Sequence, residues 1–245
     1  MSDAIIQPRR GKSSPRLGPV AVLAATEQDV RQLRDLLGFG ADSGRPMHIS
    51  RLYTASESFP DICLAGPLVG SPYAVMVAES LVAWGAQALF FLGWCGALSD
   101  TVAIGDLVLP TSALIDEGTS RHYGAAASES APSAALVYQI SDACASHGIH
   151  AHTGKVWTTD APFRETSDKV LAYRRLGGAL AVEMECSALF TLGAFRFAAV
   201  AGLLVVSDDL SSLVWRHGFK DPRFARGREA ACRVILRLCS ALKAS

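Results

Sequence analysis

The stretch ALFFLGWCG, residues 88–96, decides the fold prediction. Its first part, 88–92, is a continuous apolar run, which is typical of a strand buried on both faces of a sheet. The run ends in GWCG at 93–96, for which we predict a tight turn. A second apolar run over 197–206 predicts another strand of the same buried kind.

Strand and helix patterns alternate on both sides of this stretch. Further strands are expected at 19–25, 47–54, 61–66, 105–110, 150–157 and 179–182. Helical spacing is found at 30–37, from a turn at 69–72 to about 84, and at 131–147, 167–176, 184–195 and 222–242, where the last helix carries basic residues on its predicted outer face. This alternation predicts an α/β fold with a single domain and a central mixed β-sheet flanked by helices.

Composition narrows the classes of partner. The 245 residues include 23 basic and 23 acidic side chains, and half of the residues are hydrophobic, which argues against a disordered chain. A formal net charge of zero gives no electrostatic reason to expect nucleic acid or a membrane surface. The polar stretch at 1–17 predicts an N-terminal arm, and the remaining residues, 18–245, predict one globular domain.

Neither a membrane segment nor a metal centre is expected. The longest apolar run, 197–206, is half of the roughly 20 residues that span a bilayer, and the N-terminal stretch has no hydrophobic signal core, so we expect a cytoplasmic protein. The six cysteines show no C-x-x-C spacing and are expected to be buried free thiols. His150 and His152 have no third ligand nearby in the sequence, so we expect no metal and no cofactor.

Polar residues follow four of the predicted strands. They stand in GWCG at 93–96, in TDAPFRE at 159–165, in VEME at 182–185 and in VSDD at 206–209. Since α/β sheets bind their ligands at strand ends, these four segments are the candidate site.

Three longer segments carry a family resemblance. GWCGALSDTVAIGDLVLPTSALIDEGTSRHYG at 93–124, AVEMECSALF at 181–190 and LLVVSDDL at 203–210 occur in the order and at the spacing of the nucleoside phosphorylase superfamily, which the chain resembles from about residue 19 to its final helix. That superfamily includes purine nucleoside and uridine phosphorylases and nucleosidases. The resemblance implies an enzyme that cleaves the N-glycosidic bond of a nucleoside and assembles as a homo-oligomer.

The resemblance implies a sugar site at Glu183, Met184 and Glu185. The second glutamate would bond the ribose hydroxyls while Met184 lies against the sugar. One carboxylate can accept from two neighbouring hydroxyl groups, and so would hold the ring as positive charge develops at its anomeric carbon. The alternative is an acidic helix start that is favoured by the helix dipole.

For the leaving base, the resemblance implies a general acid at Asp208. A carboxyl group near an apolar strand end can keep its proton at neutral pH and pass it to a purine ring nitrogen. Alternatively, Asp208 caps a short turn. The uracil-reading insert of uridine phosphorylases is missing between Asp160 and Glu183, which favours a purine-like base.

Two aromatic residues, Phe163 and Trp94, are implied to face the base or the sugar, because a flat ring stacks on a purine. Core packing is the alternative for both. Arg164 is a candidate substrate-binding residue, or else forms a structural pair with Glu165.

The acceptor site departs from the phosphorylase pattern. Asp29, Phe91 and Trp94 stand where phosphorylases place two arginines and a hydroxyl residue for phosphate. None of these three can offer a dianion a charge-assisted hydrogen bond. Cations would have to come from His48, Arg51 or the arm residues Arg9 and Arg10, and the sequence leaves open whether His48 or Arg51 reaches a neighbouring subunit's site. Nucleosidases carry an acid at the position of Asp29, so this residue is expected to orient an attacking water, unless it only caps its helix.

The sequence therefore predicts an enzyme that cleaves a purine-like nucleoside, with phosphate or water as the acceptor and hydrolysis plausible. The alternatives are a pyrimidine (uridine) phosphorylase and a non-catalytic nucleoside-binding protein on the same scaffold.

Overall fold

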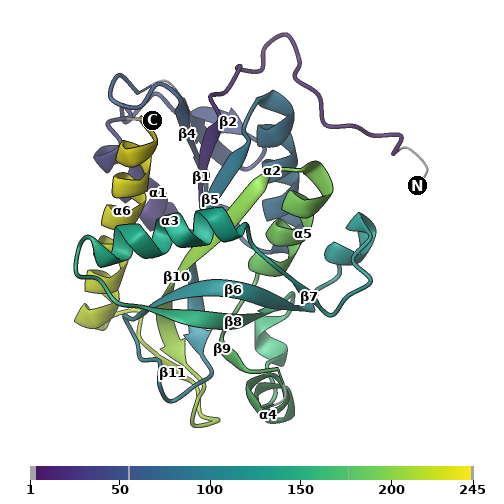
Figure 1. Ribbon diagram of the computed structural model, residues 1–245, viewed down its shortest axis with the longest axis vertical. Coiled ribbons are helices and arrows are strands. Elements are labelled where there is room, and N and C mark those ends of the chain that lie inside the picture. Colours follow the sequence, from purple (N-terminus) through teal and green to yellow (C-terminus); the bar gives the residue numbers. More distant parts are fainter. Residues whose placement is uncertain (1–3, 55, 176, 244–245) are drawn as a thin grey trace.

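The computed structural model describes residues 4–54, 56–175 and 177–243, which form one mixed sheet covered by helices (Figure 1). The strands are β1 Val20–Ala24, β2 Arg45–Met47, β3 Ser50–Tyr53, β4 Ile62–Gly66, β5 Ala88–Ala97, β6 Leu107–Asp116, β7 Glu129–Ser130, β8 Ala151–Thr159, β9 Ala179–Glu183, β10 Ala199–Asp209 and β11 Arg216–His217. The helices are α1 Glu27–Leu36, α2 Ser71–Trp84, α3 Ala134–Ala145, α4 Ser167–Arg175, α5 Cys186–Arg196 and α6 Pro222–Lys243, with short 3₁₀ turns η1 Ser120–Tyr123 and η2 Pro162–Arg164.

The sheet runs in the order β11-β10-β6-β8-β9-β5-β1-β4-β3-β2, with β7 added beside β6. β5 also pairs with β10 along its length, so five strands close into a ring in the order β5-β10-β6-β8-β9. β1, β4 and β5 are parallel neighbours, whereas β5 and β9 are antiparallel. The mixed sheet expected from the sequence is confirmed.

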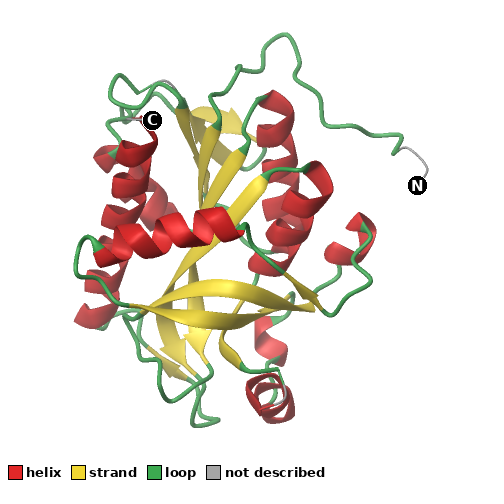
Figure 2. Cartoon of the chain, viewed as in Figure 1, coloured by secondary structure: helices red, strands yellow, loops and turns green. Residues whose placement is uncertain are grey.

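Helices cover the sheet on two faces (Figure 2). α2 and α5 pack on one face, over a core that includes Leu81 and Phe190. α1, α3 and α6 pack on the other face, over a second core that includes Leu33 and Ile235. The helix α4 covers Trp157, whose ring stacks on Tyr173 with centroids 4.4 Å apart. Burial of these apolar side chains is the main driving force for the fold.

The entry to α1 follows local sequence chemistry. Thr26 is extended and its hydroxyl oxygen accepts a hydrogen bond from the Asp29 backbone N–H at 3.3 Å. This is the geometry of an N-cap, in which the side chain satisfies an otherwise free amide of the first turn.

The tight turn expected at GWCG is wrong, because β5 continues through it to Ala97. Gly96 serves close packing there: a Cβ at this position would lie 2.6 Å from Leu210 Cδ1 and 3.3 Å from Val182 Cγ1. The strand expected from residue 197 begins instead at Ala199, since Phe197 ends α5 with a positive φ of 56° and is almost fully exposed.

Other boundaries shift by a few residues. The strand expected over 47–54 is a hairpin of β2 and β3, and β6 extends to Asp116. The predicted end of the fourth helix at residue 176, and residues 1–3 and 244–245 of the expected arm and domain, lie outside the described residues.

The arm residues that the structure describes, 4–17, contain no helix or strand and run along the surface. Three contacts fasten them: the Leu17 N–H donates to Trp84 O at 2.9 Å, Trp84 Nε1 donates to Arg9 O at 3.3 Å, and Arg45 Nη2 donates to Ser13 O at 2.7 Å. In the described ranges, every helix is too short or too polar to cross a bilayer.

All six cysteines are free and buried, as expected. Burial raises the pKa of the Cys63 and Cys239 thiols to about 12. Thiols with so high a pKa are unreactive at neutral pH. Among the described residues, no three His, Cys, Asp or Glu side chains are grouped as a metal ion would require.

Candidate functional site

Strand pairing brings three of the four candidate segments together. Cys95 and Gly96 of β5 lie opposite Val206 and Asp208 of β10, with a bulge at the intervening position. Gly96 also pairs with Val182 of β9. A side chain at position 96 would collide with these neighbours, so a glycine there lets the ends of β5, β9 and β10 meet.

A cavity of about 560 Å³ opens at this meeting point. Its walls come from the ends of β5, β9 and β10, the turn η2 and the segment that follows β10. The lining residues are Trp94, Cys95, Gly96, Pro162, Phe163, Glu165, Val182, Glu183, Met184, Ser207, Asp208, Leu210, Trp215 and Phe219. The fourth candidate segment, TDAPFRE, therefore also reaches the cavity.

Glu183 uses its carboxylate to start helix α5. One oxygen accepts from the hydroxyl group of Thr158, and Oε2 accepts from the backbone N–H groups of Glu185 and Cys186, both at 2.7 Å. These amides lie at the open end of the helix, where they have no intrahelical partner. Burial raises the pKa of Glu183, against the hydrogen bonds that it accepts.

Glu185 connects the segment 183–185, which we call the sugar segment, to the start of α2 through a hydrogen bond. Its Oε1 accepts from the Gly70 N–H at 2.5 Å, while Ser71 Oγ donates to Met184 O at 2.7 Å. The residue is buried, and burial followed by the charge of Glu183 raises the pKa of Glu185 to about 8. Met184 lines the cavity directly.

Asp208 and Glu165 face the same cavity with different surroundings. Asp208 Oδ1 accepts from Ser207 Oγ at 2.6 Å, and Oδ2 accepts from Trp215 Nε1 at 2.9 Å. Partial burial, followed by the charge of Asp208, raises the pKa of Glu165 to about 7. Sequence reasoning treated Glu165 only as a partner of Arg164. The structure does not pair them, since the described residues include no ion pair that involves Arg164.

Aromatic rings form much of the cavity wall. Trp94 packs against Phe219, with ring centroids 6.2 Å apart, and edge-on against Phe224 at 4.9 Å. Phe163 is 98% exposed at the mouth of the cavity, so it does not belong to the core. Trp215 and Phe219 were not predicted; they lie in the segment after VSDD, which has no recognisable pattern of its own.

Behind Trp94 lies a buried cluster around Asp29, which is completely inaccessible to solvent. Asp29 Oδ2 accepts from Trp94 Nε1 at 2.6 Å and from Thr26 Oγ1 at 2.8 Å. Arg228 of α6 donates from Nε to Asp29 Oδ1 at 2.7 Å, with Nη2 at 2.7 Å from the same oxygen. The guanidinium also lies over the Trp94 ring, 5.5 Å from its centroid.

Arg228 corrects the expected set of nearby cations. Its side chain is 15% exposed, so it is not on the outer face that was predicted for the basic residues of this helix. His48 lines a different cavity, and Arg51 donates to Gly44 O at 2.8 Å. Phe91 is fully buried in the core.

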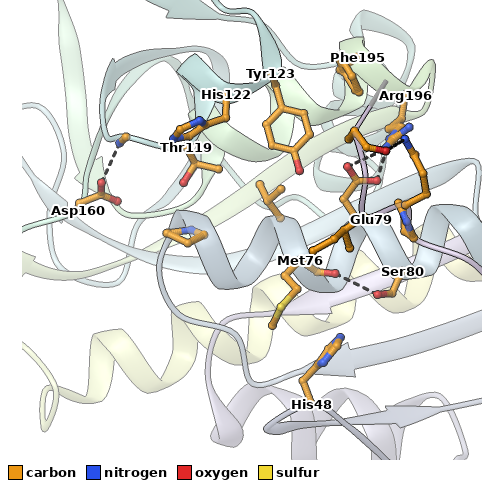
Figure 3. A pocket seen from close by; sticks show the side chains of 17 residues that line it. His48, Met76, Glu79, Ser80, Thr119, His122, Tyr123, Asp160, Phe195 and Arg196 are labelled. Atoms are coloured by element: carbon orange, nitrogen blue, oxygen red, sulfur yellow. Dashed lines mark hydrogen bonds and ion pairs between the residues drawn. The ribbon is translucent and has the colours of Figure 1, made fainter. Parts of the chain in front are cut away.

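A larger cavity, of about 850 Å³, lies beneath the described arm, on the side of α2 and α5 (Figure 3). Within this cavity an ion pair joins Arg196 to Glu79, with Nε to Oε2 at 2.8 Å and Nη2 to Oε1 at 3.0 Å. Tyr123 lies beside this pair, and burial followed by the charge of Glu79 raises its pKa to about 12. The smaller cavity is the better candidate, because Glu183 at the end of β9 and Asp208 at the end of β10 both line it.

Comparison with known proteins identifies a family over most of the chain. The model of the phosphorylase superfamily matches residues 19–240. A purine nucleoside phosphorylase of the DeoD type from Bacillus thuringiensis (strain Al Hakam) is 31% identical over 163 residues, which cover 64% of this chain and 68% of that protein.

Solved structures of similar fold include two with different activities. A uridine phosphorylase from Vibrio fischeri ES114 superposes with a TM-score of 0.80 at 22% identity, covering 96% of this chain and 98% of that one. An AMP nucleosidase from Bacteroides thetaiotaomicron VPI-5482 superposes with a TM-score of 0.71 at 26% identity, covering 94% and 91%.

Proposed function

The chain belongs to the phosphorylase superfamily, a family of nucleoside phosphorylases and nucleosidases, and from that premise we propose that it cleaves the N-glycosidic bond of a purine-like nucleoside. One observation carries the proposal: the sugar segment at Met184 and the carboxyl group of Asp208 line the same aromatic cavity. A nucleoside needs this combination, since its flat base stacks on rings while its hydroxyl groups and ring nitrogens need hydrogen-bonding partners.

On the sugar side, we assign the ribose hydroxyl groups to Glu185 and the face of the sugar to Met184. The hydrogen bond from Gly70 holds the Glu185 carboxyl group in place, which supports a fixed position for the sugar. Glu183 already accepts three hydrogen bonds from the protein. We therefore propose that Glu183 positions the sugar segment and does not itself bond a hydroxyl group.

On the base side, the aromatic wall would hold the ring and Asp208 would contact its imidazole edge. Trp94 and Phe219 offer ring faces and edges inside the cavity, and Phe163 at its mouth would cover a bound base. Protonation of a purine nitrogen makes the base a better leaving group, and a carboxyl group is suited to provide it. Arg164 does not line the cavity, so a role for it in substrate binding would need a movement of η2.

For the acceptor we propose water. The region around Asp29 is filled by the Trp94 indole and by Arg228, whose charge is already neutralised. An ionised carboxylate has about four acceptor sites. Asp29 already accepts hydrogen bonds from Thr26, Trp94 and Arg228, and the second guanidinium nitrogen of Arg228 lies 2.7 Å from Oδ1. Asp29 would therefore act through Trp94 and Arg228, which it holds in place, and not by a direct bond to the water.

Phosphorolysis is the second candidate, and the Arg228 guanidinium is the observation that favours it. If Arg228 left Asp29, it could bind a phosphate oxygen. That exchange would leave the Asp29 carboxylate buried without its partner, which opposes it strongly.

Product analysis tests the choice. Purine and pyrimidine nucleosides are incubated in phosphate-free buffer and then with increasing phosphate, and base, free ribose and ribose 1-phosphate are measured. We expect base and free ribose from a purine nucleoside without phosphate. Strict dependence on phosphate would overturn the hydrolytic assignment, and preference for uridine would overturn the purine assignment.

The remaining proposals concern organisation. We propose one domain from residue 18 onward, with an arm before it, and a homo-oligomer in the cytoplasm. Exposed apolar side chains beside the larger cavity, Ile6 at 89% and Met76 at 44%, support a contact with a second copy there. Light scattering of the purified chain would measure the oligomeric state.

A further inference from the structure

Three carboxyl groups line the proposed nucleoside cavity, and two of them, Asp208 and Glu165, have contrasting environments. Asp208 accepts one hydrogen bond on each oxygen, from the Ser207 hydroxyl group and the Trp215 indole. Hydrogen bonds donated to both oxygens stabilise the ionised form of a carboxyl group. Both oxygens of Asp208 are held by protein donors.

Glu165 has the opposite surroundings. Within residues 4–54, 56–175 and 177–243, no hydrogen bond or ion pair engages its carboxyl group, while its backbone N–H donates to Pro162 O at 3.3 Å and anchors it to η2. Partial burial and the nearby charge of Asp208 both disfavour a second negative charge, and together they raise its pKa to about 7. Glu165 is therefore about half protonated at pH 7 and mostly protonated below it, and its carboxyl group has no hydrogen-bond partner among the described residues.

We propose that Glu165 carries the proton that the leaving base receives, and that Asp208 is the ionised neighbour that orients this base. The proposal rests on the glycosidic cleavage assigned above. It gives proton donation and orientation of the base to two different residues. Where the environments of two carboxyl groups drive their proton affinities apart, the neutral one serves as the acid and the charged one as the electrostatic partner.

The step balances with water as the second reactant. The C1′–N bond breaks and its electron pair passes to the base, whose ring nitrogen takes the proton from the Glu165 carboxyl group. The sugar cation then bonds to the oxygen of water, and a proton of that water returns to the Glu165 carboxylate. Nucleoside and water become free base and free ribose, and no oxidation occurs.

Other titratable groups face this end of the cavity. Glu183 at the end of β9 and Cys95 on β5 are buried, and burial raises the pKa of both. His217 on β11 lies opposite Asp208 in the strand register. Glu183 binds three protein donors and Cys95 is a high-pKa thiol, so neither offers a mobile proton near pH 7.

The kinetic test uses the full chain with Glu165→Gln, and Asp168→Asn on the neighbouring helix as the control. For a purine nucleoside, the wild-type kcat/KM should fall as pH rises through about 7. Glu165→Gln should lower kcat/KM at pH 6 by about 100-fold or more and abolish that fall, because the amide carries no acidic proton. A variant that keeps both the rate and the pH profile overturns the assignment.

Two comparisons separate this proposal from a structural role and from the proposed function. A p-nitrophenyl riboside needs no proton on its leaving group, so Glu165→Gln should cleave it within about threefold of wild type; an equal loss on both substrates would indicate misplaced binding and overturn the proposal. A wild-type chain that cleaves no nucleoside would overturn the proposed function itself, together with the proton transfer.

A spectroscopic titration observes the proton without turnover. Trp94 and Trp215 line the cavity, so their fluorescence should report the ionisation of Glu165. We expect an inflection near pH 7 in wild type that moves to lower pH in Asp208→Asn, where the neighbouring charge is removed, and that is missing from Glu165→Gln. The same inflection in Glu165→Gln would assign the titration to another group and contradict the proposal.

Discussion

Arg228 and Asp29, 199 positions apart in the chain, are in direct contact: Nε and Nη2 of the guanidinium both lie 2.7 Å from Asp29 Oδ1. The pair is almost completely removed from solvent, and Trp94 and Thr26 complete the hydrogen bonds of the carboxylate. Breaking a buried pair of this kind leaves an uncompensated charge, which makes the contact one of the most sensitive points in the fold.

Arg228→Met should therefore destabilise the chain by about 3–5 kcal/mol, measured as the free energy of unfolding in urea. Arg233→Met on the same helix is the matched control, since Arg233 is 55% exposed and its pair with Glu229 is long, at 3.9 Å. The control should lose less than about 1 kcal/mol. Equal losses in the two variants would show that the buried pair does not stabilise the fold.

Glu185→Ala should lower kcat/KM on a purine nucleoside by orders of magnitude while the chain stays folded. The carboxyl group is proposed to hold two ribose hydroxyl groups, and leaving such groups unpaired in a buried site costs about 1–3 kcal/mol each. Activity is measured by base release, and folding by circular dichroism. A folded variant with wild-type turnover contradicts the sugar assignment.

Asp208→Asn should slow cleavage of a purine nucleoside by about 100-fold, because the amide can no longer act as a charged acceptor beside the leaving base. The Trp215 indole can still donate to the amide oxygen, so the loop should remain in place. A p-nitrophenyl riboside, which leaves readily, should be affected much less. Parallel losses on both substrates would point to a structural cap.

The stability of the empty chain should fall as pH rises from about 5 to 8. Burial and the charge of Glu183 raise the pKa of Glu185 from 4.5 to about 8, so the folded chain retains a proton that the unfolded chain has already lost in this interval. The stabilisation is complete below pH 4.5 and disappears as pH passes 8, with a slope of up to about 1.4 kcal/mol per pH unit. Urea unfolding at several pH values should show a flatter dependence in Glu185→Gln, and an unchanged slope would assign the effect elsewhere.

Gly96→Ala should reduce activity by displacing Asp208. The added methyl group would lie 2.6 Å from Leu210 Cδ1 and 3.1 Å from Asp208 Oδ2, so one of these side chains must move. Gly118→Ala is the control, because its methyl group meets only Asp160 Oδ2, at an ordinary 3.7 Å. A crystal structure and kcat/KM of both variants measure the effect, and full activity in Gly96→Ala would show that the contact is not restrictive.

Local pattern was sufficient for most of the fold. The continuous apolar run at 88–92 and the alternation of strands and helices gave the sheet, and the strand-end segments at Met184 and Asp208 do meet in one cavity. GWCG misled the prediction, because its glycines allow neighbouring strands to approach and do not form a turn. Glycine has both uses, and only the neighbours in space distinguish them.

The contacts of Arg228 could not be predicted from local pattern, because its partner Asp29 is almost a whole chain away. One signal was nevertheless present. Arg228 falls at helical spacing between Phe224 and Ala231, both buried, so it interrupts the apolar stripe of α6. A charged residue in such a stripe indicates a buried partner. Glu165 had no comparable signal, since it follows an exposed turn. Only the three-dimensional structure shows that its carboxyl group lines the cavity without a hydrogen-bond partner among the described residues.

The ring of strands also has a consequence for synthesis of the chain on the ribosome. β5 is complete once residue 97 has emerged, and β1 can pair with one of its edges, but its other edge waits for β10 at 199–209. During the intervening hundred or so residues, this long apolar edge is open to strands of other nascent chains, which makes it prone to aggregate. Synthesis that stalls between β5 and β10 should therefore leave insoluble fragments, whereas completion of β10 closes the edge and brings Asp208 to the end of β5.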